Sequence, residues 1–212
     1  MRIKVGLTCI ILGSVLILSA MLLYIHNSNE EAEAGQTSQK MLAEVVEAIK
    51  ERSSNRGFEE KDTLSANEQD SDIESAADEN DMLTVEVGGY SYIGYLYIPT
   101  LENLELPCMA QWSYDLLKQA PCRYSGSAMS DDLVLLGHNY TVHFGKLSRL
   151  EYGDRVYFTD MDGTVHTYEV LGIDVLKDTD VENMTSGEYD LSLFTCDYSG
   201  VNRLTVRCDR VS

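Results

Sequence analysis

A cysteine, Cys196, stands at the end of an apolar stretch and shortly before an arginine, Arg203. Residues 191–196 read Leu-Ser-Leu-Phe-Thr-Cys, which is typical of a buried strand, and a polar turn with Ser199 and Gly200 leads into a second strand. A thiol held beside a fixed positive charge can ionise to a thiolate, which is the reactive form of cysteine. These residues therefore predict a nucleophilic thiol at the edge of a sheet.

The second half of such a site would be a base, and His138 supplies one after another apolar stretch, residues 133–136. Histidine exchanges protons near neutral pH, and arginine can stabilise the oxyanion that forms when a thiolate attacks a carbonyl. We therefore predict one active site with Cys196 as nucleophile, His138 as general acid and base, and Arg203 as oxyanion and substrate stabiliser. Arg207 is the alternative to Arg203, since residues four apart on a strand face the same side, but it lies farther from the turn.

The elements that would position these residues are short strands concentrated in residues 82–212. Alternating or apolar stretches predict strands at residues 83–87, 92–98, 101–109, 133–136, 154–159, 164–176, 191–196 and from 203 onward. One short helix is predicted at residues 112–119, before Pro121. So many short strands with hardly any helix predict a mainly β fold, either a small antiparallel-rich barrel or a sandwich.

The N-terminal part of the chain has a different composition. Residues 5–25 carry no charge, follow Arg2 and Lys4, and have the length of a helix that crosses a bilayer. We predict an uncleaved transmembrane signal-anchor, because this run is longer than the apolar region of a signal peptide and Leu18 occupies a position where cleavage needs a small residue. The positive-inside rule then places residues 1–4 in the cytoplasm and the rest of the chain outside the cell membrane.

Residues 26–81 are expected to form an acidic extracytoplasmic stalk. Met41, Val45 and Ile49 recur at helical spacing and predict a short amphipathic helix over residues 38–52. Such a helix could pair with a second copy, rest on the membrane, or be marginally stable in the stalk. Residues 53–81 are rich in Ser, Asn, Glu and Asp, the composition of a disordered linker that would hold the domain at 82–212 off the membrane.

The net charge of −19 excludes nucleic acid as a partner, because the phosphates would be repelled. The sequence has no motif for zinc, a nucleotide or haem, and we expect no cofactor. Calcium is the weaker alternative, since the loop at residues 177–188 offers carboxylates without the regular spacing of a calcium loop. We expect this loop to be solvated and to help shape a substrate groove.

The other cysteines and one further histidine are not assigned to the site. Cys108, Cys122 and Cys208 would lie outside the cytoplasm, where disulfides form. A bond between Cys108 and Cys122 and buried free thiols are both open interpretations. His166 falls within an alternating strand, so we expect a surface side chain there.

The segments that carry the predicted site resemble the sortase family. In the family's order, the chain has Tyr-Ile-Gly-Tyr-Leu-Tyr-Ile-Pro at 92–99, Leu-Leu-Gly-His-Asn at 135–139, His-Phe-Gly-Lys-Leu at 143–147, Leu-Phe-Thr-Cys at 193–196 and Arg-Leu-Thr-Val-Arg at 203–207. The resemblance extends over residues 83–212. It implies an eight-stranded sortase-type β-barrel with one or two short helices, and a membrane-anchored cysteine transpeptidase of the Gram-positive cell surface.

The resemblance also implies a reaction. Cys196 would attack the Thr–Gly bond of an LPXTG-like sorting signal in a surface protein and form a thioester. His138 would protonate the leaving amine and then activate an amine acceptor, such as a peptidoglycan precursor or the lysine of a pilin. Thr195, Asn139 and His143 would bind substrate or line the site.

The resemblance favours a housekeeping-like or class D-like sortase. The interval from His138 to Cys196 is short for the helical insertion of class B, and no second hydrophobic segment follows the domain as in many class C enzymes. A transpeptidase that cross-links peptidoglycan would have a histidine just before the cysteine, where Phe194 and Thr195 stand here. The alternative of another class is a non-catalytic, membrane-tethered β-barrel that binds a partner and keeps Cys196 as a core thiol.

Overall fold

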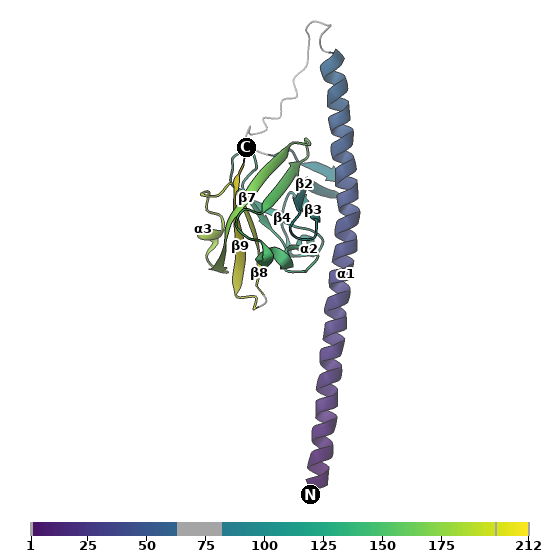
Figure 1. The fold of residues 1–212 in the computed structure, drawn as a ribbon. Coiled ribbons are helices and arrows are strands. Elements are labelled where there is room, and N and C mark those ends of the chain that lie inside the picture. Colours follow the sequence, from purple (N-terminus) through teal and green to yellow (C-terminus); the bar gives the residue numbers. More distant parts are fainter. Residues whose placement is uncertain (1, 63–81, 198, 212) are drawn as a thin grey trace.

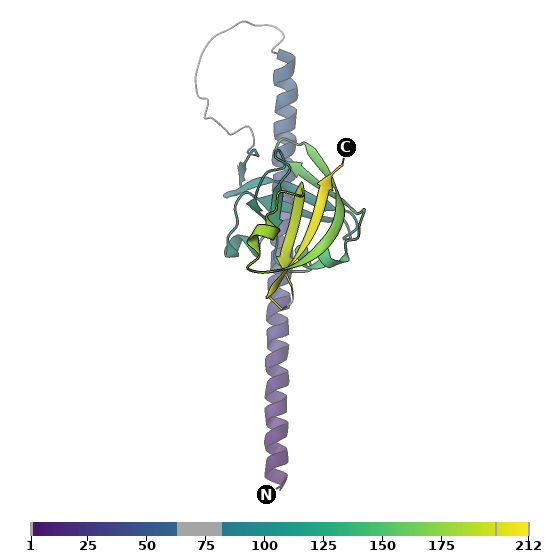
Figure 2. The ribbon, with the colours of Figure 1, turned by 90° about the vertical axis from the view of Figure 1, so that its left-hand side faces the viewer.

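The computed structural model of this chain describes residues 2–62, 82–197 and 199–211, and the side chains of the N-terminal part from residue 10 to residue 54. It consists of one long helix, α1 (Arg2–Asp62), standing beside a β-barrel (Figure 1). The helix runs along one side of the barrel and extends well beyond it toward the N-terminus. Figure 2 shows the strands of the C-terminal part in front, on the side of the barrel that faces away from α1.

The described residues from 82 onward form nine strands and three short helices, and eight of these strands make up the barrel itself. In chain order, the strands and helices are β1 (Val85–Val87), β2 (Tyr90–Ile98), β3 (Leu104–Met109), α2 (Tyr114–Leu117), β4 (Cys122–Ser125), β5 (Leu133–Leu136), η1 (Phe144–Arg149), β6 (Arg155–Asp160), β7 (Val165–Lys177), α3 (Val181–Met184), β8 (Leu191–Cys196) and β9 (Asn202–Arg210). The strand order is β1-β2-β3-β4-β5-β8-β9-β7-β6, and β6 also pairs with β2. The strands from β2 to β9 therefore close into an eight-stranded barrel, as predicted, and β1 is added to its edge.

The two faces of the strands belong to two apolar clusters. The barrel interior is filled by residues such as Ile93, Leu135 and Leu193, all fully buried. The alternate residues face outward, and Phe194 lies in the same cluster as Met41 of α1. Because successive side chains of a strand point to opposite faces, Phe194 lies on the outer face of β8, and α1 adds to the same cluster where it packs on β1, β2 and β3.

Helix α1 corrects the prediction of a separate helix over residues 38–52. These residues lie within one continuous helix, which also includes residues 53–62 of the predicted disordered linker. The physical reason is tertiary packing: Met41, Val45 and Ile49 are buried against the barrel, which stabilises a helix that would be marginal alone. The rest of that linker, residues 63–81, lies outside the described residues.

The N-terminal half of α1 has the properties expected of a membrane span. Within Ile10–Ser54 it contains a window of mean hydropathy 1.9, none of which is buried by the protein. By length and composition this is sufficient to cross a bilayer.

The end of the barrel at the β6–β7 hairpin contains a bonded polar network. His166 is 5% exposed, so the expectation of a surface side chain is wrong. Its Nε2 lies 2.8 Å from Asp160 Oδ2, and its Nδ1 lies 2.7 Å from Arg210 Nη1. Alternation predicted the strand but not that His166 shares the interior face of β7 with Tyr168 and Val170.

Cys108, Cys122 and Cys208 are free, buried thiols. Cys108 belongs to the interior cluster and Cys122 to the outer cluster, so the two side chains lie on different sides of the sheet. The open question of a disulfide between them is thereby answered in favour of buried thiols.

Candidate active site

Three neighbouring strands bring the predicted catalytic residues to one end of the barrel. Strands β5 and β8 are parallel, with Leu136 opposite Phe194, and the N–H of Gly137 donates to the carbonyl of Phe194 at 3.0 Å. His138 follows the end of β5 by two residues, as Cys196 follows Phe194 by two residues, so both stand at the same end of this strand pair. On the other side, antiparallel pairing places Arg203 of β9 directly opposite Cys196.

The alternation of β8 determines which side chains share the face of the thiol. Phe194 and Cys196 lie on the outer face, and Cys196 is a partly exposed free thiol. Thr195 lies between them and points to the interior, where it is 4% exposed and its hydroxyl has no partner among the described residues. The Thr195 hydroxyl thus lies on the opposite face of β8 from the thiol, and a contact between Thr195 and substrate stays a prediction.

The turn between β8 and β9 is organised by Asp197. Its carboxylate accepts hydrogen bonds from the Ser199 hydroxyl at 2.6 Å and from the Asn202 side chain at 2.8 Å. These bonds, led by that of Ser199, lower the pKa of Asp197 to about 2. Within the turn so formed, Arg203 Nη1 donates to the carbonyls of Gly200 and Asn202 at 3.2 and 3.1 Å.

Arg207 has a different environment from Arg203. It is 4% exposed, and its guanidinium donates to Ser192 Oγ at 2.9 Å and to Asp174 Oδ2 at 3.1 Å. The Arg207 guanidinium also donates to the backbone carbonyls of Asn183 and Met184, which attaches α3 and the polar loop at residues 177–188 to the barrel. Arg207 therefore holds the scaffold together, whereas Arg203 lies beside the thiol.

His138 begins a tight loop that two glycines make possible. The N–H of Phe144 donates to the carbonyl of His138 at 3.1 Å, and the N–H of Gly145 donates to that of Tyr140 at 2.9 Å. A Cβ at Gly137 would lie 2.4 Å from the Phe144 ring, and one at Gly145 would lie 2.5 Å from a backbone oxygen. Only glycine fits at both positions, which explains why Gly-His-Asn and His-Phe-Gly occur together here.

The imidazole of His138 is held by an aromatic neighbour. The Tyr140 ring stacks on it with a centroid distance of 3.9 Å and an interplanar angle of 10°. Burial lowers the pKa of His138, while a hydrogen bond with the Asn139 side chain opposes this shift. The Nδ1 atom is buried and has no partner among the described residues. Tyr140 was missed by the sequence analysis, although it follows the Gly-His-Asn motif directly.

His143 lies beneath the site and does not line it. Its side chain is fully buried, and neither ring nitrogen has a hydrogen-bond partner among the described residues. Burial, assisted by the charge of His138, lowers the pKa of His143 to about 4, so it is neutral at physiological pH. The nearest aromatic ring is that of Tyr140, whose centroid is 5.7 Å away, so an effect of His143 on substrate would be indirect and stays a prediction.

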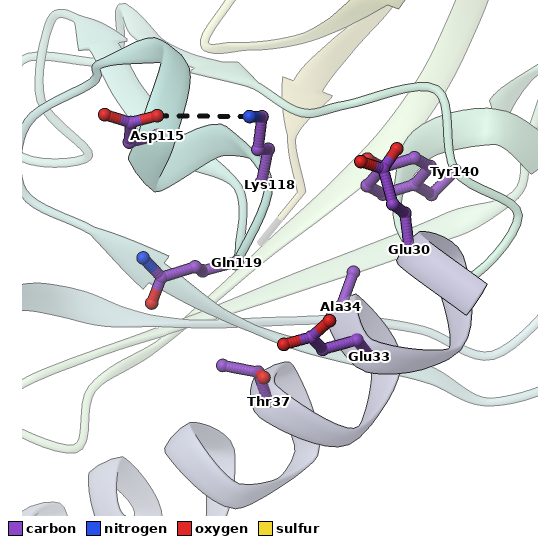
Figure 3. A pocket seen from close by; sticks show the side chains of 8 residues that line it. All are labelled: Glu30, Glu33, Ala34, Thr37, Asp115, Lys118, Gln119 and Tyr140. Carbon is purple, nitrogen blue, oxygen red and sulfur yellow. Dashed lines mark ion pairs between the residues drawn. The ribbon is translucent and has the colours of Figure 1, made fainter. Parts of the chain in front are cut away.

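Helix α1 forms a wall beside the loop that carries His138. A cavity of about 540 Å³ lies between the helix and this loop. Residues 138–141 of the loop and Lys118 line one side of it. The helix lines the other side with Tyr24, Asn27, Ser28, Glu30 and Glu31. Figure 3 shows the adjoining pocket, which lies between Glu30, Glu33 and Thr37 of the helix and the Lys118–Asp115 ion pair on the barrel. No local sequence pattern connects residues so far apart in the chain.

Within the part of the chain that is described, no group of three or more His, Cys, Asp or Glu side chains is placed to hold a metal ion. In the polar loop, the carboxylate of Asp180 accepts from the Asn183 side chain at 2.9 Å.

Comparison with known proteins gives a consistent result. A family model described as the Sortase domain matches residues 96–211. Sortase C from Streptococcus pneumoniae is 25% identical with a TM-score of 0.52, and the match covers 57% of this chain and 69% of that one. Sortase A from Corynebacterium diphtheriae is 25% identical with a TM-score of 0.53, covering 58% of this chain and 62% of that one. No curated protein matches the chain.

Proposed function

Because the chain belongs to the sortase family of cysteine transpeptidases, we propose that it cleaves an LPXTG-like sorting signal and joins the surface protein to an amine. The observation that supports the catalytic assignment is the register of β5, β8 and β9, which pairs Arg203 with Cys196 and ends β5 two residues before His138 at the same end of the barrel. Membership in the family also disfavours the alternative of a barrel that only binds a partner.

The first half of the reaction forms a thioester. The Cys196 sulfur attacks the carbonyl carbon of the Thr–Gly bond, and the Arg203 guanidinium stabilises the oxyanion of the tetrahedral intermediate. When the C–N bond breaks, His138 donates a proton to the leaving amine. The surface protein is then bound to Cys196 through its threonine carbonyl.

The second half transfers the protein to an amine. The amine nitrogen attacks the thioester carbonyl, His138 accepts the proton that the nitrogen loses, and the Cys196 thiolate departs as the new amide forms. Among the described contacts of Arg203, only Nη1 is bonded, so the other guanidinium N–H groups can donate to the oxyanion in both halves.

We propose that α1 anchors the enzyme in the membrane with residues 1–4 in the cytoplasm and the barrel outside. The apolar window of α1 and the basic Arg2 and Lys4 before it support this orientation. The amine acceptor would be a peptidoglycan precursor or the lysine of a pilin. The S. pneumoniae sortase C has pilin substrate specificity, whereas the C. diphtheriae enzyme is a sortase A, so the class favoured from the sequence, housekeeping-like or class D-like, stays a prediction.

A peptide-cleavage assay tests this proposal. The full chain in detergent micelles is incubated with a panel of fluorogenic LPXTG-type peptides, with and without hydroxylamine, which intercepts a thioester as a hydroxamate. Wild type should cleave and form the hydroxamate, and Cys196→Ala should do neither. Cys122→Ala, which removes a buried thiol of the outer cluster, is the matched control and should retain activity. Equal rates for wild type and Cys196→Ala would refute the proposal.

A further inference from the structure

The helix that enters the membrane also contacts the loop that carries His138. The Glu31 Oε1 atom accepts a hydrogen bond from the backbone N–H of Thr141 at 2.5 Å and a second from the Thr141 hydroxyl. Glu31 is half-buried in this contact. One carboxylate oxygen therefore binds both the main chain and the side chain of a residue three positions after His138, and bonds to a charged acceptor are stronger than neutral ones.

One helical turn farther along α1, the chain makes a close packing contact with the next loop residue. A Cβ at Gly35 would lie 3.3 Å from Val142 Cγ1, and the neighbouring Ala34 is 5% exposed. Glycine within a helix costs about 0.5–1 kcal/mol relative to alanine, so its presence here is explained by the close approach of the loop. Together, the contacts of Glu31 and Gly35 fix residues 141 and 142 to the helix.

Tyr140 connects this contact with the imidazole. It precedes Thr141 directly, and its carbonyl accepts from the N–H groups of His143 and Gly145 at 2.9 Å, which restrains its backbone from the other side. Its ring stacks on His138 at 3.9 Å. A displacement of Thr141 would therefore move the Tyr140 ring and remove the stacking contact that holds the imidazole of His138.

We propose that Glu31 is a positioning residue for His138, and that it acts by holding Thr141 and thereby keeping the Tyr140 ring stacked on the imidazole. The inference rests on the proposed role of His138 as general acid and base. Glu31 touches no reacting atom. The active site is thus completed by a helix outside the barrel.

This assignment places the reaction close to the membrane. With a rise of about 1.5 Å per residue, Glu31 lies about 9 Å beyond residue 25, the end of the predicted span. In Figure 1 the end of the barrel where β8 meets β9 points toward the N-terminal half of α1. A single rigid helix would then set both the distance of the site from the bilayer and the orientation of its histidine.

Steady-state kinetics of the full chain in micelles test the proposal. Glu31→Ala should lower kcat about tenfold and leave KM for the sorting peptide unchanged, since small misplacements of a catalytic group act on turnover. Glu31→Gln keeps an acceptor oxygen for Thr141, so its kcat should stay within about threefold of wild type. The control is Glu47→Ala, because Glu47 is exposed on the same helix. Its kinetics should match wild type.

A double-mutant cycle identifies the route of the effect. If Glu31 acts through Tyr140, the Glu31→Ala/Tyr140→Ala variant should be no slower than Tyr140→Ala alone. Additive losses would overturn the route through Tyr140. A kcat for Glu31→Ala equal to that of wild type, with Cys196→Ala inactive, would overturn the inference and leave the proposed function intact.

The imidazole signals of His138 in a nitrogen-15 NMR spectrum provide a readout independent of turnover. They should shift or broaden in Glu31→Ala and stay unchanged in Glu47→Ala. Unchanged signals in both variants would overturn the inference. If wild type and Cys196→Ala were equally inactive, the proposed function would fail, and the NMR result would still decide whether Glu31 orients His138.

Discussion

The two ends of the barrel each hold a histidine and an arginine, but the two pairs differ in how completely they are bonded. At the β6–β7 end, His166 is bonded through both ring nitrogens, to Asp160 and to Arg210. At the other end, His138 has a buried Nδ1 without a partner among the described residues, and Arg203 uses only Nη1 in its described contacts. Buried polar groups in proteins are almost always bonded, so the unsatisfied end is the one suited to a substrate.

The same contrast separates the two arginines of β9. Arg207 is buried among Ser192, Asp174 and carbonyls of the polar loop, while Arg203 lies in the turn next to Cys196. Two arginines of one strand thus differ in role. Arg207 uses its N–H groups for bonds within the protein, whereas Arg203 keeps N–H groups that can bind a substrate. Each of the following predictions tests this distinction.

The largest effect is expected for the two histidines. His138→Ala should lower kcat/KM about 1000-fold with little change in melting temperature, because general acid–base catalysis contributes about 10²–10⁴-fold. His166→Ala should instead lower the melting temperature, because it removes one hydrogen-bond partner each from Asp160 and Arg210, and it should keep activity per folded molecule. Peptide-cleavage rates and thermal unfolding of both variants measure the changes in kcat/KM and in melting temperature. If His166→Ala loses as much activity as His138→Ala, the distinction between a catalytic His138 and a structural His166 is wrong.

The two arginines are expected to differ in the same sense. Arg203→Ala should lower kcat about 100-fold, since it removes an oxyanion donor. Arg207→Ala should destabilise the protein by about 2 kcal/mol, because the fully buried Ser192 hydroxyl loses its partner, whereas the half-exposed Asp174 carboxylate can bind water instead. Denaturant unfolding and turnover of the folded fraction separate the two effects. Equal catalytic losses would show that the oxyanion stabiliser is not Arg203 alone.

A smaller effect concerns His143, which is buried without partners beneath the catalytic end. Burial lowers its pKa to about 4, whereas an unfolded histidine titrates near 6.5. As the pH falls below about 6.5, the unfolded state binds a proton that the folded state does not, so stability decreases with falling pH down to about pH 4. Between about pH 7 and about pH 5 we expect a loss of about 2 kcal/mol from this residue.

His143→Phe removes the titrating group while retaining an aromatic side chain of similar size. The free energy of unfolding of this variant should therefore decrease less than that of wild type between about pH 7 and about pH 5, as measured by urea denaturation. The same dependence in both proteins would assign the acid sensitivity to other groups.

The smallest effect is expected at Thr195. Its buried hydroxyl lacks a partner among the described residues, so Thr195→Val should change stability by less than about 1 kcal/mol, toward greater stability. Turnover should stay within about twofold of wild type, because the side chain points into the barrel. A large increase in KM for the sorting peptide would restore Thr195 as a substrate contact.

Much of the barrel could be predicted because its strands are encoded locally. The apolar stretches at residues 133–136 and 191–196 are both strands in the structure. Each strand ends at the predicted residue. Strand β4 was missed, since Cys122–Ser125 is short and is specified mainly by pairing with β5. Alternation also gave the correct strand for His166 but not its burial, which depends on Asp160 and Arg210 from other strands.

The sequence by itself determined the strands, the types of residue that could react, and the apolar N-terminal segment, because each depends on neighbouring residues. The tertiary structure alone decided that β5, β8 and β9 are adjacent, which pairs Arg203 with Cys196 and brings the end of β5, two residues before His138, beside β8. It also decided that Glu31 of α1 binds Thr141, a contact across 110 positions of the chain. Contacts of this kind depend on closure of the barrel and on burial of one helix face, and neither leaves a local pattern in the sequence.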